Sequence, residues 1–355
     1  MLFQFERVIV VSQMWNEIRE QPLALERCLT KNISIIKEIS REIRNSHIEQ
    51  VVIAARGTSD HAAVYGKYVI ELLTGKPVAL AASSIFTIYN RNLDLRNCLV
   101  IGISQSGRAA DVIEVIRSAN STGAVTMGIT NHADSPLASE VKYHLDCDAG
   151  EELSVAATKT FITQIFLLAQ LTVEWAEDEG LKGELSTLPE KVSRTLETSK
   201  EIEGKVERYR FMDECFVLAR GINYAVSLEA ALKMQETAYV RAKAFATSDF
   251  QHGPIAMIDR DIPIIIFAPN GPSLKDVGEM AEKLAQSKME TIIVSNNRSI
   301  IKTGTCGFSI PETDNDIISP FFNVVVAQMF ACRLAEVKDL DPDNPRRLRK
   351  VTITR

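Results

Sequence analysis

The chain has 355 residues, of which 46% are hydrophobic and 24% are charged, and its formal net charge is −6 at pH 7. This composition is typical of a soluble globular protein with room for two domains, and the acidic balance argues against a surface that binds nucleic acid or an anionic membrane. The six cysteines are scattered, with no C-x-x-C pair and no histidine at metal-ligand spacing, which favours reduced thiols in a cytoplasmic protein over a disulfide framework or a zinc site.

The N-terminal part of the chain predicts a helical arm over residues 1–46. Residues 1–13 themselves fit no helix pattern, and charges at Glu6 and Arg7 argue against a signal peptide, so we expect the natural protein to start at Met14. From residue 15 to about residue 44, apolar side chains recur at helical spacing, and Pro22 interrupts that pattern. We therefore expect an arm of helix that breaks near Pro22.

Similar segments recur at one offset along the chain, which predicts a duplicated domain. An apolar run before Gly57 reappears before Gly221, and the run that ends at Gly107 is matched by the run that ends at Gly271; both pairs of glycines are 164 residues apart. Each copy alternates strand and helix patterns, so we predict an α/β fold whose two units each have a parallel sheet with helices on both faces. A third pair of strand-like segments, each followed by Asn, comprises residues 125–130 and 292–295.

These patterns divide the chain into five predicted parts. The arm is followed by a first α/β unit, a charged helical connector between the units, a second α/β unit and a basic tail. Their expected bounds are 1–46, 47–182, 183–210, 211–340 and 341–355.

Two uncharged stretches need to be considered as membrane-spanning helices. Residues 160–173 and 317–332 contain no charged side chain, but both stretches fall short of the roughly 18 to 20 residues that span a bilayer. We expect both to be helices buried between layers of the protein.

The four residues Ser104-Gln105-Ser106-Gly107 directly follow an uncharged apolar run and precede a helical pattern. The first backbone amides of a helix lack intrahelical partners, and the helix dipole favours an anion there. Serine hydroxyls add donors, and a glycine lets the backbone approach a ligand closely. The turn therefore predicts a phosphate site, although an ordinary polar loop between a strand and a helix fits the same four residues.

Tandem α/β units with a Ser-Gln-Ser-Gly turn resemble the sugar isomerase (SIS) domain family. The best match is to its double-SIS enzymes: the isomerase half of glucosamine-6-phosphate synthase (glutamine–fructose-6-phosphate aminotransferase), type II glucosamine-6-phosphate deaminases and fructosamine-6-phosphate deglycases. The resemblance runs from Met14 to the end of the chain and implies two tandem, flavodoxin-like, three-layer αβα domains. The motifs that support it are 56–60 (RGTSD), 104–107 (SQSG), 157–159 (ATK), the segment 229–254 and Lys350.

The resemblance implies which residues hold the substrate. Family members usually carry a Ser or Thr two residues after the motif glycine, where this chain has Ala109, so phosphate affinity is expected to be weaker unless Arg108 helps. The resemblance assigns the phosphate to Ser59, Ser104, Gln105, Ser106 and Gly107, and the rest of the sugar to Gly57, Thr58, Val155, Ala157 and Lys159.

The same resemblance implies catalytic roles for Glu236, Lys233, His252 and Lys350. A carboxylate such as Glu236 can move a proton between C1 and C2 of an open-chain sugar, and Lys233, three residues earlier on a helix, would keep it ionised or orient the sugar. His252 would open the ring and would come from a neighbouring subunit. Lys350 would contact the open-chain sugar, with a Schiff base as one form of that contact, from a tail that acts as a lid. Each residue taken alone also fits a structural role: a surface ion pair, a structural histidine and a cation in a mobile tail.

Several net reactions fit these parts. The chain has no glutaminase domain with a catalytic cysteine, so we expect glucosamine 6-phosphate and water to give fructose 6-phosphate and ammonia. A deglycase acting on a fructosamine 6-phosphate, a synthase-type isomerase without its glutaminase, and a sugar-phosphate sensor without turnover are the alternatives. Glu151 and Glu152 could meet the substrate amine. We expect no metal and no organic cofactor, a sugar 6-phosphate as ligand, a homodimer with shared sites, and no nucleic-acid or membrane partner.

Overall fold

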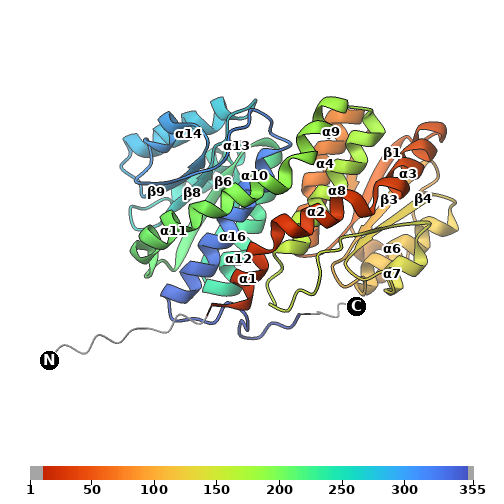
Figure 1. Ribbon diagram of the computed structural model, residues 1–355, viewed down its shortest axis with the longest axis horizontal. Helices are drawn as coiled ribbons and strands as arrows, with labels where there is room; N and C mark the ends of the chain where they lie inside the picture. Colours follow the sequence, from red (N-terminus) through yellow and green to blue (C-terminus); the bar gives the residue numbers. More distant parts are fainter. Residues whose placement is uncertain (1–10, 351–355) are drawn as a thin grey trace.

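The computed structural model describes residues 11–350, and within them the chain forms two α/β units that lie side by side (Figure 1). Each unit is built on a five-stranded, fully parallel sheet with helices packed on both faces. The prediction of two tandem α/β units is confirmed. Residues 1–10, which precede the start expected at Met14, lie outside the described part of the chain. Ser12 is the N-cap of the first helix, and Met14 is buried.

The first unit has the strand order β2-β1-β3-β4-β5. Its central strand β3 (Cys98–Ile103) is buried at all six residues, as expected for a parallel strand covered on both faces. The other strands are β1 (Gln50–Ala54), β2 (Val78–Leu80), β4 (Val125–Thr130) and β5 (Tyr143–Asp146). The helices are α4 (Thr58–Thr74), α5 (Ser84–Thr87), α6 (Ala110–Ser121), α7 (Pro136–Glu140) and α8 (Lys159–Ala176).

The second unit repeats this topology, because its order β7-β6-β8-β9-β10 places corresponding strands in corresponding positions. Gly57 follows β1 and Gly221 follows β6, and both glycines have a positive φ, near 53° and 61°. The strands are β6 (Glu214–Ala219), β7 (Arg241–Ala246), β8 (Ile264–Phe267), β9 (Thr291–Ser295) and β10 (Cys306–Ser309). The helices are α12 (Tyr224–Ala238), α13 (Thr247–Gln251), α14 (Leu274–Gln286), α15 (Arg298–Ile301) and α16 (Ser319–Val337), with 3-10 turns η3 (Gly221–Asn223) and η4 (Pro254–Met257).

Two sets of helices lie outside the sheets and cross one face of the molecule (Figure 1). The N-terminal set begins a new helix where Pro22 occupies the first turn, a position that needs no backbone N–H. This set comprises α1 (Gln13–Arg19), α2 (Gln21–Lys31) and α3 (Ile33–Asn45). The set between the units comprises α9 (Glu179–Ser186), α10 (Leu188–Thr195), η1 (Leu196–Thr198), α11 (Ser199–Lys205) and η2 (Val206–Tyr209).

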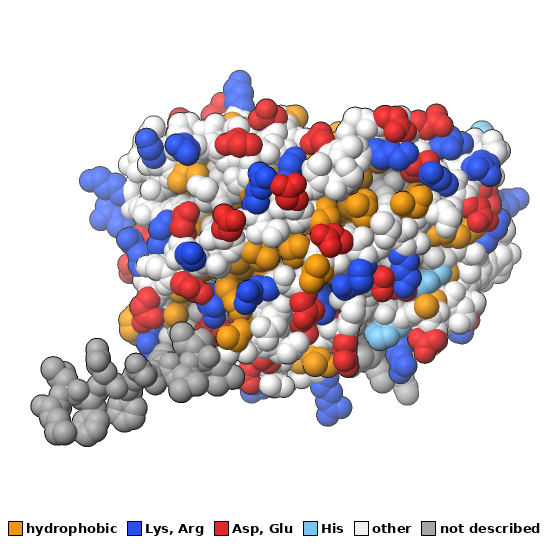
Figure 2. Space-filling view, in the orientation of Figure 1, with side chains coloured by type: hydrophobic (Ala, Val, Ile, Leu, Met, Phe, Trp, Pro, Cys, Tyr) orange, Lys and Arg blue, Asp and Glu red, His pale blue; other side chains and the backbone are white. Residues whose placement is uncertain are grey.

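The core joins the two units through four helices, since α4 packs against α8, and α12 packs against both α16 and α4. The two uncharged stretches fall in α8 and α16, so the prediction of buried core helices is confirmed. By length and composition α16 alone among the described helices would qualify as a membrane span, but 83% of its most apolar window is buried in the protein. Figure 2 shows acidic and basic side chains interspersed on the face drawn there.

Candidate active site

A cleft of about 420 Å³ opens where the chain leaves strands β1 and β3, at the edge of the first sheet that faces α12 of the second unit. In open parallel sheets, ligands bind in a crevice beyond the carboxyl ends of the strands, at the point where the strand order reverses. In this sheet, β1 and β3 flank that point. The cleft is lined by residues 56–59, 103–106, 109, 155, 157, 236 and 348–350.

The 104–107 turn forms one end of this cleft. The amide of Gly107 donates to the carbonyl of Ser104 at 3.1 Å, which closes the turn, and Gly107 has a φ of 63°. A Cβ at this position would overlap the side chain of Ser135, so both the backbone conformation and the space require glycine. Nearby, Ser59 lies in the first turn of α4, and its hydroxyl accepts a hydrogen bond from Gln164 at 3.1 Å. The structure therefore brings the predicted phosphate residues together around two helix starts.

One cation at this end comes from a residue that the sequence reasoning did not assign. Arg56 lines the cleft, and its guanidinium lies 2.6 Å from the buried carboxylate of Asp111 in the first turn of α6. Arg108, the residue considered as a substitute for the missing hydroxyl at Ala109, is exposed and does not line the cleft. Arg56 belongs to the motif 56–60, and its position next to Gly57 was the available signal.

The first unit differs here from its duplicate. The residues of the second unit that correspond to 104–107 are Ala268, Pro269, Asn270 and Gly271, so the two serine hydroxyls are missing. The carboxylate of Asp316 packs against Gly271, where a ligand would approach the backbone. The duplicated fold thus carries the hydroxyl-lined turn in its first unit.

A buried ion network contributes Glu236 to the lining of the cleft. The Lys233 ammonium lies 2.6 Å from Glu236 and 3.3 Å from Glu229, and it donates to the Thr58 hydroxyl at 3.1 Å. Lys233 and Glu229 have no exposed side-chain surface, whereas Glu236 is 21% exposed and lines the cleft. Burial disfavours the charged amine, but the two carboxylates outweigh it and raise the pKa of Lys233 above its usual value. The alternative of a surface ion pair is therefore wrong.

Glu229 has its own partners, which the sequence reasoning did not identify. Its carboxylate lies 2.8 Å from Nδ1 of His61 and accepts a hydrogen bond from the Thr58 hydroxyl at 3.2 Å. Both partners lie in the first turn of α4, so α4 of the first unit and α12 of the second are joined by polar contacts directly behind the cleft. The sequence signal for a contact with Lys233 was that Glu229 lies one helical turn before it.

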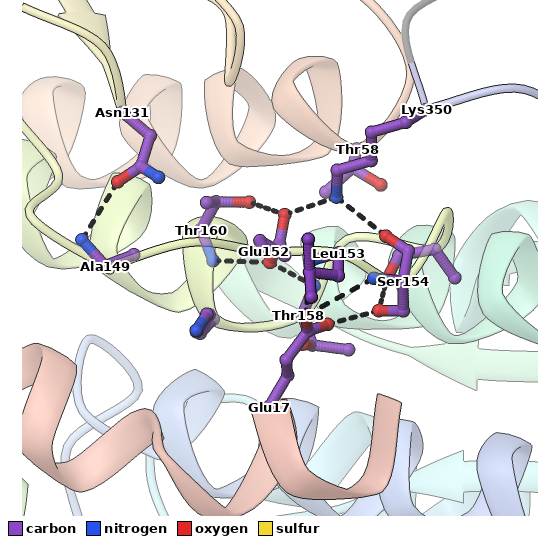
Figure 3. Close-up of polar contacts among 12 residues, drawn as sticks. Glu17, Thr58, Asn131, Ala149, Glu152, Leu153, Ser154, Thr158, Thr160 and Lys350 are labelled. Atoms are coloured by element: carbon purple, nitrogen blue, oxygen red, sulfur yellow. Dashed lines mark hydrogen bonds and ion pairs between the residues drawn. The ribbon is translucent and has the colours of Figure 1, made fainter. Parts of the chain in front are cut away.

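The tail lysine lies at the rim of the cleft. The Lys350 ammonium donates to Glu152 and to the carbonyl of Ser154, both at 2.8 Å (Figure 3). Burial would raise the pKa of Glu152, but the Lys350 charge and hydrogen bonds from the amides of Thr158 and Thr160 hold it below its usual value. Of the two residues considered as contacts for the substrate amine, Glu152 is buried and pairs with Lys350, while Glu151 is exposed.

The predicted sugar-binding loop is divided between the cleft and the core. Val155 and Ala157 line the cleft, and the Val155 amide donates to the carbonyl of Asp343 at 3.3 Å. Lys159 does not line the cleft, because its side chain is buried and its ammonium forms an ion pair with Glu20 at the start of α2. The structure thus directs Lys159 toward the N-terminal helices.

His252 lies outside the cleft of its own chain. It follows α13 directly and is exposed to solvent. Its predicted role depends on a second copy of the chain and stays a prediction.

Ala109 allows a direct test of phosphate binding. It lines the cleft and is the N-cap of α6, where no side chain accepts a hydrogen bond from the first turn. Ala109→Ser should stabilise the fold by about 0.5–2 kcal/mol through capping, and should tighten binding of a sugar phosphate by about tenfold through one hydrogen bond to a charged group. Thermal melting with and without inorganic phosphate, together with titration of the sugar phosphate, measures both effects.

The neighbouring exposed residue supplies the control for that substitution. Ala110→Ser places the same hydroxyl one residue later, at a position that does not line the cleft. It should leave phosphate affinity unchanged. Equal affinity in both variants would mean that phosphate does not bind at this helix start.

Comparison with known proteins agrees with this geometry. A family model for the SIS domain matches residues 42–174 and 212–338. Glutamine–fructose-6-phosphate aminotransferase (isomerizing) from Aquifex aeolicus is 35% identical over 344 residues, which cover 96% of this chain and 57% of that protein. The chain thus spans a little over half the length of the curated relatives it matches.

Two solved structures match this chain over the whole of their own length. A candidate phosphosugar isomerase from Silicibacter pomeroyi is 31% identical with a TM-score of 0.84, and the match covers 94% of this chain and 100% of that one. Glucosamine-6-phosphate deaminase from Thermotoga maritima matches with a TM-score of 0.78 over 97% of this chain and 100% of that one. At 21% identity, the second likeness shows the fold alone.

Proposed function

Because the chain belongs to the SIS-domain family, with two SIS units, we propose that it is a phosphosugar-isomerising enzyme that converts glucosamine 6-phosphate and water to fructose 6-phosphate and ammonia. One observation supports this proposal above the others. The hydroxyl-lined 104–107 turn and the partly exposed carboxylate of Glu236 line the same cleft, although they come from different units. That arrangement suits a linear substrate with an anion at one end and a reacting carbonyl at the other.

The proposed chemistry is a proton transfer followed by hydrolysis. Glu236 takes the proton from C2 of the open-chain amino aldehyde and returns it to C1, while the C1 oxygen gains the proton that the C2 nitrogen loses, so that the C2 amine becomes an imine of the ketose. Water adds to this imine carbon, and the C–N bond breaks to release ammonia and fructose 6-phosphate. The Lys233 ammonium lies 2.6 Å from Glu236 and orients its carboxylate, and the Lys350 ammonium lies where it can contact the sugar chain.

The complete site in this proposal is shared between two copies of the chain. His252 is exposed on the second unit and is free to enter the cleft of a partner, where an imidazole suits the proton exchange of ring opening. We expect a homodimer in solution, measured by light scattering, and loss of activity on His252→Ala that a partner carrying an intact His252 restores in mixed dimers.

Free thiols fit a reducing compartment. All six cysteines are unpaired, and five of them are buried. We place the protein in the cytoplasm on this ground.

The relatives favour one second candidate, the amination of fructose 6-phosphate. The 35% identity to an isomerizing aminotransferase points to that direction, and the same proton transfer between C1 and C2 serves both directions. Assays in which ammonia is released from glucosamine 6-phosphate or consumed with fructose 6-phosphate compare the two.

Ammonia release from a panel of substrates tests the proposed function. We expect turnover of glucosamine 6-phosphate and, because the phosphate anchors the substrate, at least about a hundredfold lower kcat/KM for glucosamine without phosphate. Release of lysine from fructose-lysine 6-phosphate without turnover of glucosamine 6-phosphate would identify a deglycase instead. Binding of sugar phosphates without turnover of any would reject an enzyme.

A further inference from the structure

The C-terminal segment is attached to the body of the protein at Asp343 and at Lys350, and between them the Arg346 amide donates to the Tyr239 hydroxyl at 2.8 Å while its guanidinium lies over the Tyr239 ring. At the first, both carboxylate oxygens of Asp343 accept hydrogen bonds from the amides of Gln13 and Met14, each at 2.7 Å, and so cap α1. At the second, the Lys350 ammonium binds Glu152 and the carbonyl of Ser154. Between these points Leu348 and Arg349 line the cleft.

Glu152 is held in place on every side. Its Oε1 accepts the amides of Thr158 and Thr160 at 2.9 and 3.0 Å, at the start of α8, and its Oε2 accepts the Thr160 hydroxyl at 2.8 Å (Figure 3). The remaining contact of Oε2 is the bond to Lys350. The side chain has no exposed surface, so the carboxylate is a fixed point beneath the tail.

The Ser154 carbonyl is fixed by a second buried carboxylate. Glu17 of α1 accepts hydrogen bonds from the amides of Leu153 and Ser154 and from the Ser154 hydroxyl. Since Asp343 caps the same helix, α1 connects the attachments of the tail at Asp343 and Lys350. The loop that presents Glu152 is therefore joined to α1 by three hydrogen bonds.

We propose that Glu152 is a positioning residue for the proposed reaction and that it acts through Lys350. By binding the Lys350 ammonium, Glu152 holds that group at the cleft and keeps residues 348–350 in place as part of the cleft lining. This inference rests on the proposed function for its kinetic part. Glu152 touches no substrate in this account, since it lies beneath Lys350 and is not part of the lining. The alternative is that Glu152 only caps α8.

Glu152→Gln separates these two roles. The amide oxygen of glutamine can still accept the amides of Thr158 and Thr160, whereas its NH₂ group then faces the Lys350 ammonium and cannot accept from it. We expect kcat/KM to fall about tenfold or more, as expected for loss of a charge-assisted contact. Thr160→Val removes the hydroxyl bond to the same oxygen but keeps the lysine pair, and it should change kcat/KM by less than about twofold.

A double-mutant cycle with Lys350→Met tests whether Glu152 acts through the lysine. If it does, Glu152→Gln has no further effect on kcat/KM once Lys350 is replaced. Independent, multiplicative effects of the two substitutions would overturn the proposal. So would an unchanged kcat/KM in Glu152→Gln.

Trypsin cleavage of the tail provides a measurement that needs no turnover. Arg347 and Arg349 lie between the Arg346 contact and Lys350, so freeing Lys350 should raise the rate of cleavage there several-fold in both Glu152→Gln and Lys350→Met, but not in Thr160→Val. Equal cleavage rates in the wild type and Glu152→Gln would overturn the role of Glu152. Absence of turnover in the wild type rejects the proposed function, and the cleavage rates then still decide whether Glu152 positions the tail.

Discussion

Glu236→Gln is expected to lower kcat by about a hundred- to ten-thousand-fold, the range that a positioned general base contributes. The amide retains the shape of the carboxylate but cannot take a proton, and the Lys233 ammonium keeps Glu229 as a partner. Binding of the sugar phosphate should change little, because the proposed phosphate site is the 104–107 turn and does not include Glu236. Steady-state kinetics and titration of fructose 6-phosphate measure the two quantities separately.

The same substitution distinguishes an enzyme from a sugar-phosphate sensor. In a sensor, Glu236→Gln should leave the response to ligand intact and there should be no turnover to lose. Glu282→Gln on the exposed face of α14 is the matched control and should leave both kinetics and binding unchanged. Wild-type rates in Glu236→Gln would remove the carboxylate from the mechanism.

Lys233→Met is expected to destabilise the fold by about 3–5 kcal/mol, the usual cost of removing one partner from a buried ion pair. It leaves the buried carboxylate of Glu229 and the partly buried Glu236 without their shared cation. Activity should be lost as well, since Glu236 loses the partner that orients its carboxylate at the cleft. Urea denaturation monitored by circular dichroism gives the free energy of unfolding.

The stability lost in Lys233→Met should depend on pH in one direction. The folded-state pKa of Lys233 is raised, so its stabilising effect is fully present below its unfolded pKa near 10.5 and is lost only as the pH rises through the higher folded value. The stability lost in Lys233→Met should therefore persist across pH 5 to 8 and shrink only above about pH 10.5. A deficit that changes across pH 5 to 8 would contradict this account.

Two controls accompany Lys233→Met. Lys283→Met, at an exposed site on α14, should change stability by less than about 0.5 kcal/mol. Adding Glu229→Gln to Lys233→Met should recover part of the lost stability, because it removes one uncompensated charge.

The sequence predicted the fold because its signals are local. The paired glycines after β1 and β6 needed only a comparison of short segments, and the uncharged stretches in α8 and α16 needed only a count. The same local reasoning placed the 104–107 turn at the end of a buried strand.

The polar partners could not be predicted in this way, because they join residues far apart in the chain. Lys159 meets Glu20, 139 residues away, and Lys350 meets Glu152, 198 residues away. The chain offers many carboxylates to each lysine, and only the packing of α1, α2 and the tail decides between them. His252 is a further case, since its predicted site lies on another molecule.

The cap that Asp343 forms on α1 means that the beginning and the end of the described chain stabilise one another. A shortened protein that stops before Asp343 would expose the first amides of α1 and loosen Glu17, although residues 343–350 belong to neither sheet. Such truncations should melt at lower temperature than their size suggests, and affinity tags near either end need a spacer long enough to leave this junction undisturbed.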